Sequence, residues 1–478
     1  MFNIKTSCIS ATKQRKRKMS RPHILAVPYP AQGHVIPFLE LSQHLVKHGF
    51  RVTFVNTEHT HNRVMNGLQE KSCIGNENEI RLVSIPDGLE PWEDRNDLGK
   101  VGGKIIQVMS QKLQELIEKI SREEDQKIFC LIVDKWAGFT IPAAEKMKIR
   151  KVAFWPAAVA TLALIYNTQK LIDDGIIDTD GIPIKKQIIQ LAQNMPEIDC
   201  TKLVWTSMGG KDLASQKGMF EILKNNIEAG KAADYLICNS AYDLEPGAFS
   251  LFPNILPIGP LLPSNRQANS AGSFWPEDST CLDWLDQQQP NSVIYVAFGS
   301  FTVLDKTQFQ ELALGLELTN MPFLWVVRLD ITDEPNEAYP EGFQDRVAGR
   351  SRLVSWAPQQ KVLSHPSTAC FFSHCGWNST LEGVSNGVPF LCWPYFSDQF
   401  IDESYICDIW KVGSKFNKDE KGIITREEIK SKVDQVLGDE SFKARAVELQ
   451  ESALKSVKEG GQSTGILRIS LNGSMHSS

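Results

Sequence analysis

The stretch HILAVPYPAQGHVIPFLELSQHLVKHGFRVTFV, residues 23–55, decides the fold class. Residues 23–28 form a short, mostly apolar run that is typical of a buried parallel strand. Apolar side chains then recur at helical spacing from Ile36 to Val46, and Gly49 suits the end of such a helix. Residues 51–55 form the next strand. A strand, a helix and a second strand make a βαβ unit, which predicts a parallel sheet covered by helices.

The same alternation continues along the chain and starts again after a linker. In the first series we expect strands at residues 80–85, 129–133, 152–154 and 235–238, and helices at 104–121 and 140–148. In the second series we expect strands at 293–298, 324–327 and 369–373, and a helix at 306–319. Residues 261–276 between them are rich in Pro, Ser, Asn and Gly, as linkers are. We therefore predict an α/β protein of two doubly wound domains with a cleft between them.

Composition and charge restrict the class of protein. The chain has 478 residues, of which 42% are hydrophobic and 23% charged, and this length exceeds what a single core usually serves. The formal net charge of -6 makes nucleic acid an unfavourable partner. The sequence alone does not indicate an oligomer, so a monomer is the default expectation.

No stretch favours a membrane span or a secretory signal. The longest apolar run, residues 152–166, is interrupted by Pro156 and Thr161, and we interpret it as a buried core helix. The basic cluster at residues 13–18 precedes no apolar stretch, so residues 1–20 are predicted to be a disordered tail. Ten cysteines occur without paired spacing, which indicates reduced thiols and a cytoplasmic localisation.

The motifs of several common enzyme classes are absent from the sequence. There is no GxGxxG after a strand, no GxxxxGK[ST], no HExxH and no GxSxG, so redox, P-loop, zinc-protease and hydrolase chemistry lose support. The pair Asp178 and Asp180 has the spacing of a cation ligand set, but its Gly-rich surroundings favour a solvated turn. We therefore predict no metal site.

Chemically specific residues are concentrated between Trp356 and Gln399. A strand is expected to end near Ser373, and a helix to begin near Asn378 or Ser379, since Asn and Ser are favoured N-caps. The N–H groups and dipole of a helix N-terminus attract anions. On this evidence alone the region is either a phosphate cradle or an ordinary strand–turn–helix junction.

The spacing of these residues resembles a known signature. The strings Trp356-Ala357-Pro358-Gln359, His374-Cys375-Gly376-Trp377-Asn378-Ser379, Glu382-Gly383 and Asp398-Gln399 resemble, in order and spacing, the plant secondary-product box of the family 1 UDP-glycosyltransferases. The resemblance extends from Arg21 to about Gly461. It implies the GT-B fold, in which two Rossmann-like domains face each other across a cleft.

The resemblance also divides the chain. We expect an N-terminal acceptor-binding domain at residues 21–258, a linker at 259–280, a C-terminal UDP-sugar-binding domain at 281–455 and a return segment at 456–478. The family usually ends in an apolar helix that packs on the first domain, whereas residues 470–478 here are polar.

Eleven residues are assigned donor-binding roles by the resemblance. The uracil and ribose would be held by Trp356, Ala357, Gln359 and Glu382. The diphosphate would be held by Ser300, His374, Asn378 and Ser379. The sugar hydroxyls would be met by Trp377, Asp398 and Gln399. Each role suits the residue type: an aromatic ring stacks on a base, a carboxylate accepts from a diol, and neutral donors stabilise a diphosphate.

The resemblance further assigns a catalytic pair. A lone histidine after a strand, as His34 is, more often has a structural role. Here it matches the family's general base, and Asp134, at the end of an apolar strand, matches the aspartate that orients it. The implied reaction is an inverting displacement that gives a β-O-glucoside without metal or cofactor, with UDP-glucose as co-substrate.

The acceptor is expected to be a small lipophilic metabolite. Phenols are favoured over aliphatic alcohols because their pKa, about 10, lies closer to that of imidazole, about 6.5. Glucose esters stay open, since carboxylates need no base. Trp377 and Gln399 fit the glucose-using pattern of the family. Two alternatives are a non-catalytic UDP-sugar binder or sensor, and a GT-B nucleotide-sugar epimerase or hydrolase.

Overall fold

A computed structural model describes residues 21–67, 80–93, 95, 98–123, 127–208, 212–262, 272–332, 338–458 and 460–463. The predicted tail at residues 1–20, part of the predicted linker and the polar end at 470–478 lie outside the described residues. Within the described residues, no helix is long and apolar enough to cross a membrane.

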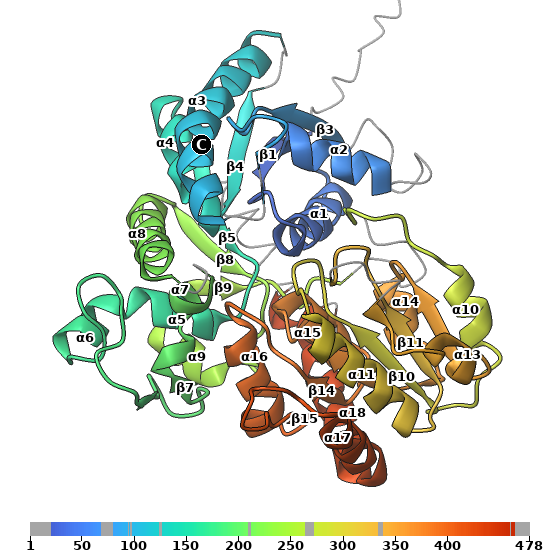
Figure 1. The fold of residues 1–478 in the computed structure, drawn as a ribbon. Coiled ribbons are helices and arrows are strands. Elements are labelled where there is room, and N and C mark those ends of the chain that lie inside the picture. The colour runs from blue at the N-terminus through green and yellow to red at the C-terminus, as the bar shows by residue number, and fades with distance from the viewer. Residues whose placement is uncertain are drawn as a thin grey trace, which may run out of the picture.

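The N-terminal half is built on a parallel sheet (Figure 1), whose described strands run in the order β3-β2-β1-β4-β5-β8-β9. These strands are β1 (His23–Val27), β2 (Arg51–Thr57), β3 (Ile80–Ile85), β4 (Ile128–Asp134), β5 (Arg150–Trp155), β8 (Tyr235–Cys238) and β9 (Ile255–Pro257). The helices of this half are α1 (Gln32–Lys47), α2 (Glu58–Gly67), α3 (Leu98–Glu123), α4 (Ile141–Lys146), α5 (Val159–Tyr166), α6 (Thr168–Asp173), α7 (Val204–Met208), α8 (Leu213–Gly230) and α9 (Pro246–Leu251). Short 3-10 turns, η2 (Lys135–Thr140) and η3 (Cys200–Lys202), and a small hairpin of β6 (Ile188–Ile189) and β7 (Ile198–Asp199) complete it.

The C-terminal half repeats this plan on a second parallel sheet, of order β12-β11-β10-β13-β14-β15 in the described residues. Its strands are β10 (Val293–Ala297), β11 (Phe323–Val326), β12 (Ser351–Val354), β13 (Thr368–Ser373), β14 (Phe390–Cys392) and β15 (Gly413–Lys415). Its helices are α10 (Thr280–Leu285), α11 (Lys306–Leu318), α13 (Phe343–Val347), α14 (Gln359–Leu363), α15 (Trp377–Ser385), α16 (Gln399–Ser404), α17 (Arg426–Gly438) and α18 (Glu440–Val457), with a π-turn, η4 (Tyr405–Ile409), after α16.

Each sheet is buried on both faces, which explains why its strands are continuously apolar. On β1, Ile24 and Ala26 pack in the core beneath α1, whereas Leu25 and Val27 pack on the opposite face beneath α3. Strand β10 alternates in the same way between two cores of the C-terminal half. Burial on both faces is the usual condition of an all-parallel sheet.

The two halves are joined by hydrogen bonds and by shared cores. The indole N–H groups of Trp377 and Trp410 donate to the carbonyls of Asn239 (2.8 Å) and Leu244 (3.0 Å). Near the end of the described chain, the Ser463 hydroxyl donates to the carbonyl of Gly259 at 2.7 Å. The described beginning of the predicted return segment therefore contacts the first residue of the predicted linker.

Two expectations about local structure were wrong. The strand expected at residues 152–154 is confirmed within β5, which pairs with β4 and β8, but the apolar run 152–166 is not one buried helix, because α5 begins only at Val159 after Pro156. Helix α15 begins at Trp377 with Gly376 as N-cap and no side-chain cap bond. Asn378 is the second residue of the helix and not its cap, and its side-chain N–H₂ donates to the carbonyl of Gly33 in the other half.

Candidate active site

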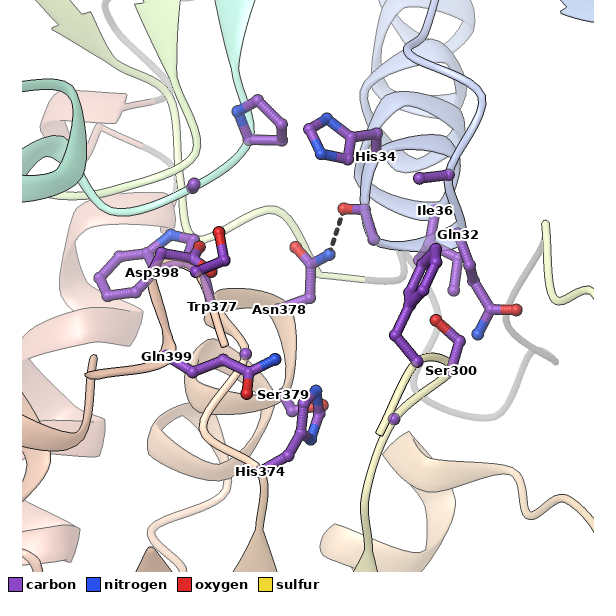
Figure 2. Close-up of a pocket in the computed structure, with 18 of the residues that line it drawn as sticks. Gln32, His34, Ile36, Ser300, His374, Trp377, Asn378, Ser379, Asp398 and Gln399 are labelled. Carbon is purple, nitrogen blue, oxygen red and sulfur yellow. Dashed lines mark hydrogen bonds between the residues drawn. The ribbon is translucent and has the colours of Figure 1, made fainter. Parts of the chain in front are cut away.

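A cavity lies where the carboxyl ends of the two sheets face each other (Figure 2), and both halves line it. Every residue predicted to bind the donor lines this cavity, and so does His34. Asp134 lies behind His34, fully buried. The structure thus brings together residues that are up to 365 positions apart, from His34 to Gln399.

The predicted catalytic pair is in contact. His34 lies in the first turn of α1, directly after β1, and Asp134 ends the neighbouring strand β4. The Nδ1 of His34 is 2.8 Å from Oδ2 of Asp134, and the other carboxylate oxygen accepts from the Trp136 N–H at 2.9 Å. With Nδ1–H donating to the carboxylate, Nε2 carries the lone pair. His34 is 22% exposed, so Nε2 is accessible to a substrate proton.

Aromatic rings form the wall around His34. The ring of Tyr29 lies 5.3 Å from the imidazole, and Trp136 meets it edge-on at 6.3 Å. Trp155 stacks on Trp136 at 6.3 Å. Burial and the charge of Asp134 raise the pKa of Tyr29 to about 12, so its phenol stays neutral. This side of the cavity is suited to a lipophilic ring.

A hydrogen-bond network fixes the predicted uridine corner. The amide of Gln359 donates to the hydroxyl of Ser379 at 2.8 Å and to Glu382 at 2.5 Å, and its carbonyl accepts from the Tyr295 hydroxyl at 3.0 Å. Burial raises the pKa of Glu382 to about 7. Trp356 lines the same part of the cavity. Glu382 is thereby held in place beside a planar aromatic side chain.

The predicted diphosphate corner is neutral and rich in donors. Helix α15 directs its free N-terminal N–H groups from Trp377 onward toward this side. Burial and the positive charge of Arg328 lower the pKa of His374 to about 4, so its imidazole is neutral. A Cβ on Gly299 or on Gly376 would lie 2.5 or 2.6 Å from Nε2 of His374. Both glycines therefore leave the room that this ring occupies.

Two residues at the start of α16 border the predicted sugar position. Gln399 accepts the backbone N–H groups of Tyr395 (2.7 Å) and Phe396 (3.1 Å) with its side-chain oxygen, which leaves its amide N–H₂ as a donor to the cavity. Burial raises the pKa of Asp398 to about 6. The indole N–H of Trp377 is already used by Asn239, so Trp377 can offer a sugar only its ring or its backbone.

The Asp178–Asp180 pair forms a turn, as predicted. One oxygen of Asp178 accepts the N–H groups of Asp180 (2.9 Å) and Ile182 (2.8 Å), and Asp180 pairs with Lys217 at 2.6 Å. In the part of the chain that the structure describes, no three His, Cys, Asp or Glu side chains group as a metal-ligand set.

Comparison with known proteins agrees with this geometry. A family model described as UDP-glucoronosyl and UDP-glucosyl transferase matches residues 227–455. UDP-glycosyltransferase 83A1 of Arabidopsis thaliana is 45% identical over 458 residues, which are 93% of this chain and 95% of the relative. The chain belongs to the plant family 1 UDP-glycosyltransferases. It is therefore a glycosyltransferase enzyme that takes a UDP-sugar as co-substrate.

Solved plant UDP-glycosyltransferases share the fold. A UDP-glucosyltransferase from Polygonum tinctorium capable of glucosylating indoxyl is 28% identical, with a TM-score of 0.79 over 96% of this chain and 99% of its own. Phytolacca americana UGT2, solved with UDP-2-fluoro-glucose and pterostilbene, is 26% identical, with a TM-score of 0.77 over 95% of this chain and 100% of its own. The predicted GT-B fold with two Rossmann-like halves is confirmed.

The sequence motifs did not indicate the residues that hold the site residues in place. Tyr295 fixes Gln359, and Asn239 fixes Trp377. Met219, Ile222 and Asn226 of α8 also line the cavity. Helix α8 carried no polar motif, so only its packing against the first half could have revealed it.

A methyl group at position 299 should displace His374 and weaken UDP binding. Gly299 has φ +64, and the added Cβ would lie 2.5 Å from the imidazole. We expect Gly299→Ala to raise the Kd for UDP by roughly tenfold or more, or about 1.4 kcal/mol, by titration calorimetry. Gly422→Ala is the matched control, because Gly422 also has positive φ (+81) but its Cβ would meet nothing within 4 Å. Equal UDP affinities in the two variants would refute the role of His374.

Uridine binding should strengthen as pH rises through 7. In its predicted role Glu382 accepts two ribose hydroxyls as a carboxylate, and burial raises its pKa to about 7. The ionised fraction of a group with this pKa rises roughly tenfold from pH 6 to pH 8, so the Kd for uridine should fall by a similar factor. Uridine is chosen because it carries no titrating phosphate.

Other carboxyls ionise in the same range, so the test needs paired variants. Burial, and further the charge of Glu382, raises the pKa of Glu277 to about 7 and that of Glu40 to about 8. Glu382→Gln should flatten the pH profile of uridine affinity, whereas Glu277→Gln should preserve it. A flat profile in Glu277→Gln with a preserved profile in Glu382→Gln would indicate that Glu277, and not Glu382, binds the ribose.

Proposed function

We propose that this enzyme transfers glucose from UDP-glucose to a hydroxyl group of a small, uncharged, lipophilic acceptor by a single inverting displacement. The observation that carries the proposal is the His34–Asp134 pair at 2.8 Å, with His34 facing the cavity that the donor-binding residues line. Glucose as the sugar is supported by Trp377 and Gln399 and by the glucose-using structural relatives.

The reaction forms one bond and breaks one at the anomeric carbon. The acceptor oxygen attacks from the side opposite the UDP, its proton moves to Nε2 of His34, and the C–O bond to the β-phosphate breaks. Asp134 stabilises the imidazolium that forms and holds the ring in place. A positioned base of this kind contributes roughly 10²–10⁴-fold to the rate. Inversion of the α-linked donor gives a β-glucoside.

The lining of the cavity favours neutral acceptors. Among the cavity-lining residues that the structure describes, none is Lys or Arg, whereas Asp398 lies close enough to His34 for the charge of each to act on the other. A carboxylate acceptor would meet this negative group without a cation to pair with, which is unfavourable in a desolvated site. The aromatic wall of Tyr29, Trp136 and Trp155 suits a planar ring, so phenols are the acceptors we propose first.

The two alternative functions, a UDP-sugar sensor and a nucleotide-sugar epimerase or hydrolase, would leave parts of the cavity without a role. A UDP-sugar sensor needs neither a base nor an orienting carboxylate, yet both are present and in contact. An epimerase or hydrolase needs no lipophilic chamber, whereas Ile105, Phe139 and Met219 line one beside His34. Glucosyl transfer to a hydroxyl is the function that uses every part of the cavity.

The proposal is tested with UDP-glucose and a panel of phenols, aliphatic alcohols and carboxylic acids, with products detected by mass spectrometry. We expect hexose adducts on phenols first and few or none on carboxylic acids. His34→Ala should lower kcat by roughly 10²–10⁴-fold. The same variant should leave the Kd for UDP within about twofold, since His34 is not among the residues predicted to bind the donor.

Unmodified enzyme that binds UDP but gives no adduct with any acceptor would contradict transfer and favour a sensor. Adducts formed on carboxylic acids alone, unaffected by His34→Ala, would contradict the role of the base and the preference for hydroxyls.

A further inference from the structure

The leaving group of the proposed reaction is a nucleoside diphosphate, yet none of the described residues that line the cavity is Lys or Arg. Its charged lining is instead acidic, with Glu277, Glu382 and Asp398. A diphosphate that gains negative charge as the glycosidic bond breaks needs positive potential close by. A guanidinium lies in the layer directly behind the cavity.

Arg328 follows strand β11 and is 2% exposed. Its guanidinium donates to the carbonyl of Gly299 and, at 2.7 Å, to the carbonyl of Thr302. These two carbonyls flank Ser300, which lines the cavity at the predicted diphosphate corner (Figure 2). The guanidinium therefore lies behind the loop that presents Ser300.

The charge of Arg328 also acts on His374. It contributes, after burial, to the lowered pKa of this histidine, whose ring packs against Gly299. Its carboxylate partner, Asp330, contacts Nε at 2.9 Å but is 65% exposed, so water screens much of the negative charge. The buried cation is screened less, and positive potential remains on the side of the cavity.

A second guanidinium belongs to this group. Arg63 of α2 stacks over the rings of Phe274 (4.6 Å) and Trp275 (4.5 Å). The charges of Asp330 and Arg328 both act on Arg63, so its guanidinium adds a second positive charge to this region.

We propose that Arg328, acting through the Gly299–Thr302 loop, supplies the positive potential that binds the diphosphate of the donor and stabilises departing UDP. It is a positioning residue, because the loop lies between it and the phosphates. This inference rests on the proposed UDP-sugar site. A buried charge held by three hydrogen bonds needs no reorganisation when the leaving group develops its charge.

A purely structural role would have Arg328 do no more than satisfy two loop carbonyls. An electrostatic role should affect the binding of UDP but not of uridine, which has no phosphate, whereas a structural role should affect both alike. The test therefore compares the Kd of UDP with that of uridine, by calorimetry, for Arg328→Gln, Arg328→Lys and Asp330→Asn. Arg346→Gln is the matched control, since it removes a cation that pairs with Glu317 away from the cavity.

Arg328→Gln should raise the Kd of UDP by roughly tenfold, or about 1.4 kcal/mol, while the Kd of uridine stays within about twofold of its original value. Arg328→Lys should recover part of this loss. Asp330→Asn removes an exposed negative charge and should strengthen UDP binding by about threefold, because screened charges have small effects. Arg346→Gln should change the Kd of neither UDP nor uridine.

Equal losses for UDP and uridine in Arg328→Gln, or unchanged UDP affinity in Asp330→Asn, would overturn the inference. If Arg328→Gln does not fold, Asp330→Asn decides alone, because its side chain is exposed and its removal opens no cavity. Unmodified enzyme that binds neither UDP nor uridine would instead contradict the proposed function, so the two failures are distinguishable.

Discussion

The contact between the first turn of α1 and the first turn of α15 joins the two halves at the reaction centre. The amide of Asn378 donates to the carbonyl of Gly33, the residue before the proposed base. A helix start that can hold a diphosphate is thereby fixed against a helix start that carries His34. Neither half contains both groups, so the chemistry exists only while the two sheets face each other. The indole of Trp377 on Asn239 and the return of the chain to Gly259 preserve the same arrangement.

Both halves place their functional groups at the carboxyl ends of parallel strands, which explains how much the sequence could predict. Apolar runs such as residues 23–27 and 293–297 are continuous because both faces of each strand are buried, and they marked the strands clearly. The polar residues that follow those runs, among them His34, Asp134 and Ser300, could be found by position alone. Their assignment to a donor and a base needed the family resemblance.

What the sequence could not predict depends on contacts between distant segments. Asn378 was expected to cap its own helix, but its amide bonds across the cleft, and Gly376 takes the N-cap. Residues 152–166 were interpreted as a buried helix although a strand was expected at 152–154, because composition alone does not show how many residues fit the sheet position between β4 and β8. Arg328 has no motif of its own, although its place at the carboxyl end of β11 was a signal that strand-end logic could have used.

The central claim is a single displacement in which His34 deprotonates the acceptor while UDP leaves from the opposite face. The most direct measurement is the anomeric configuration of the product formed from UDP-α-glucose and a phenol, read from the coupling of its anomeric proton in the NMR spectrum. The account predicts the β-glucoside alone. An α-glucoside would show retention, which this site, with one base and one orienting carboxylate, does not explain.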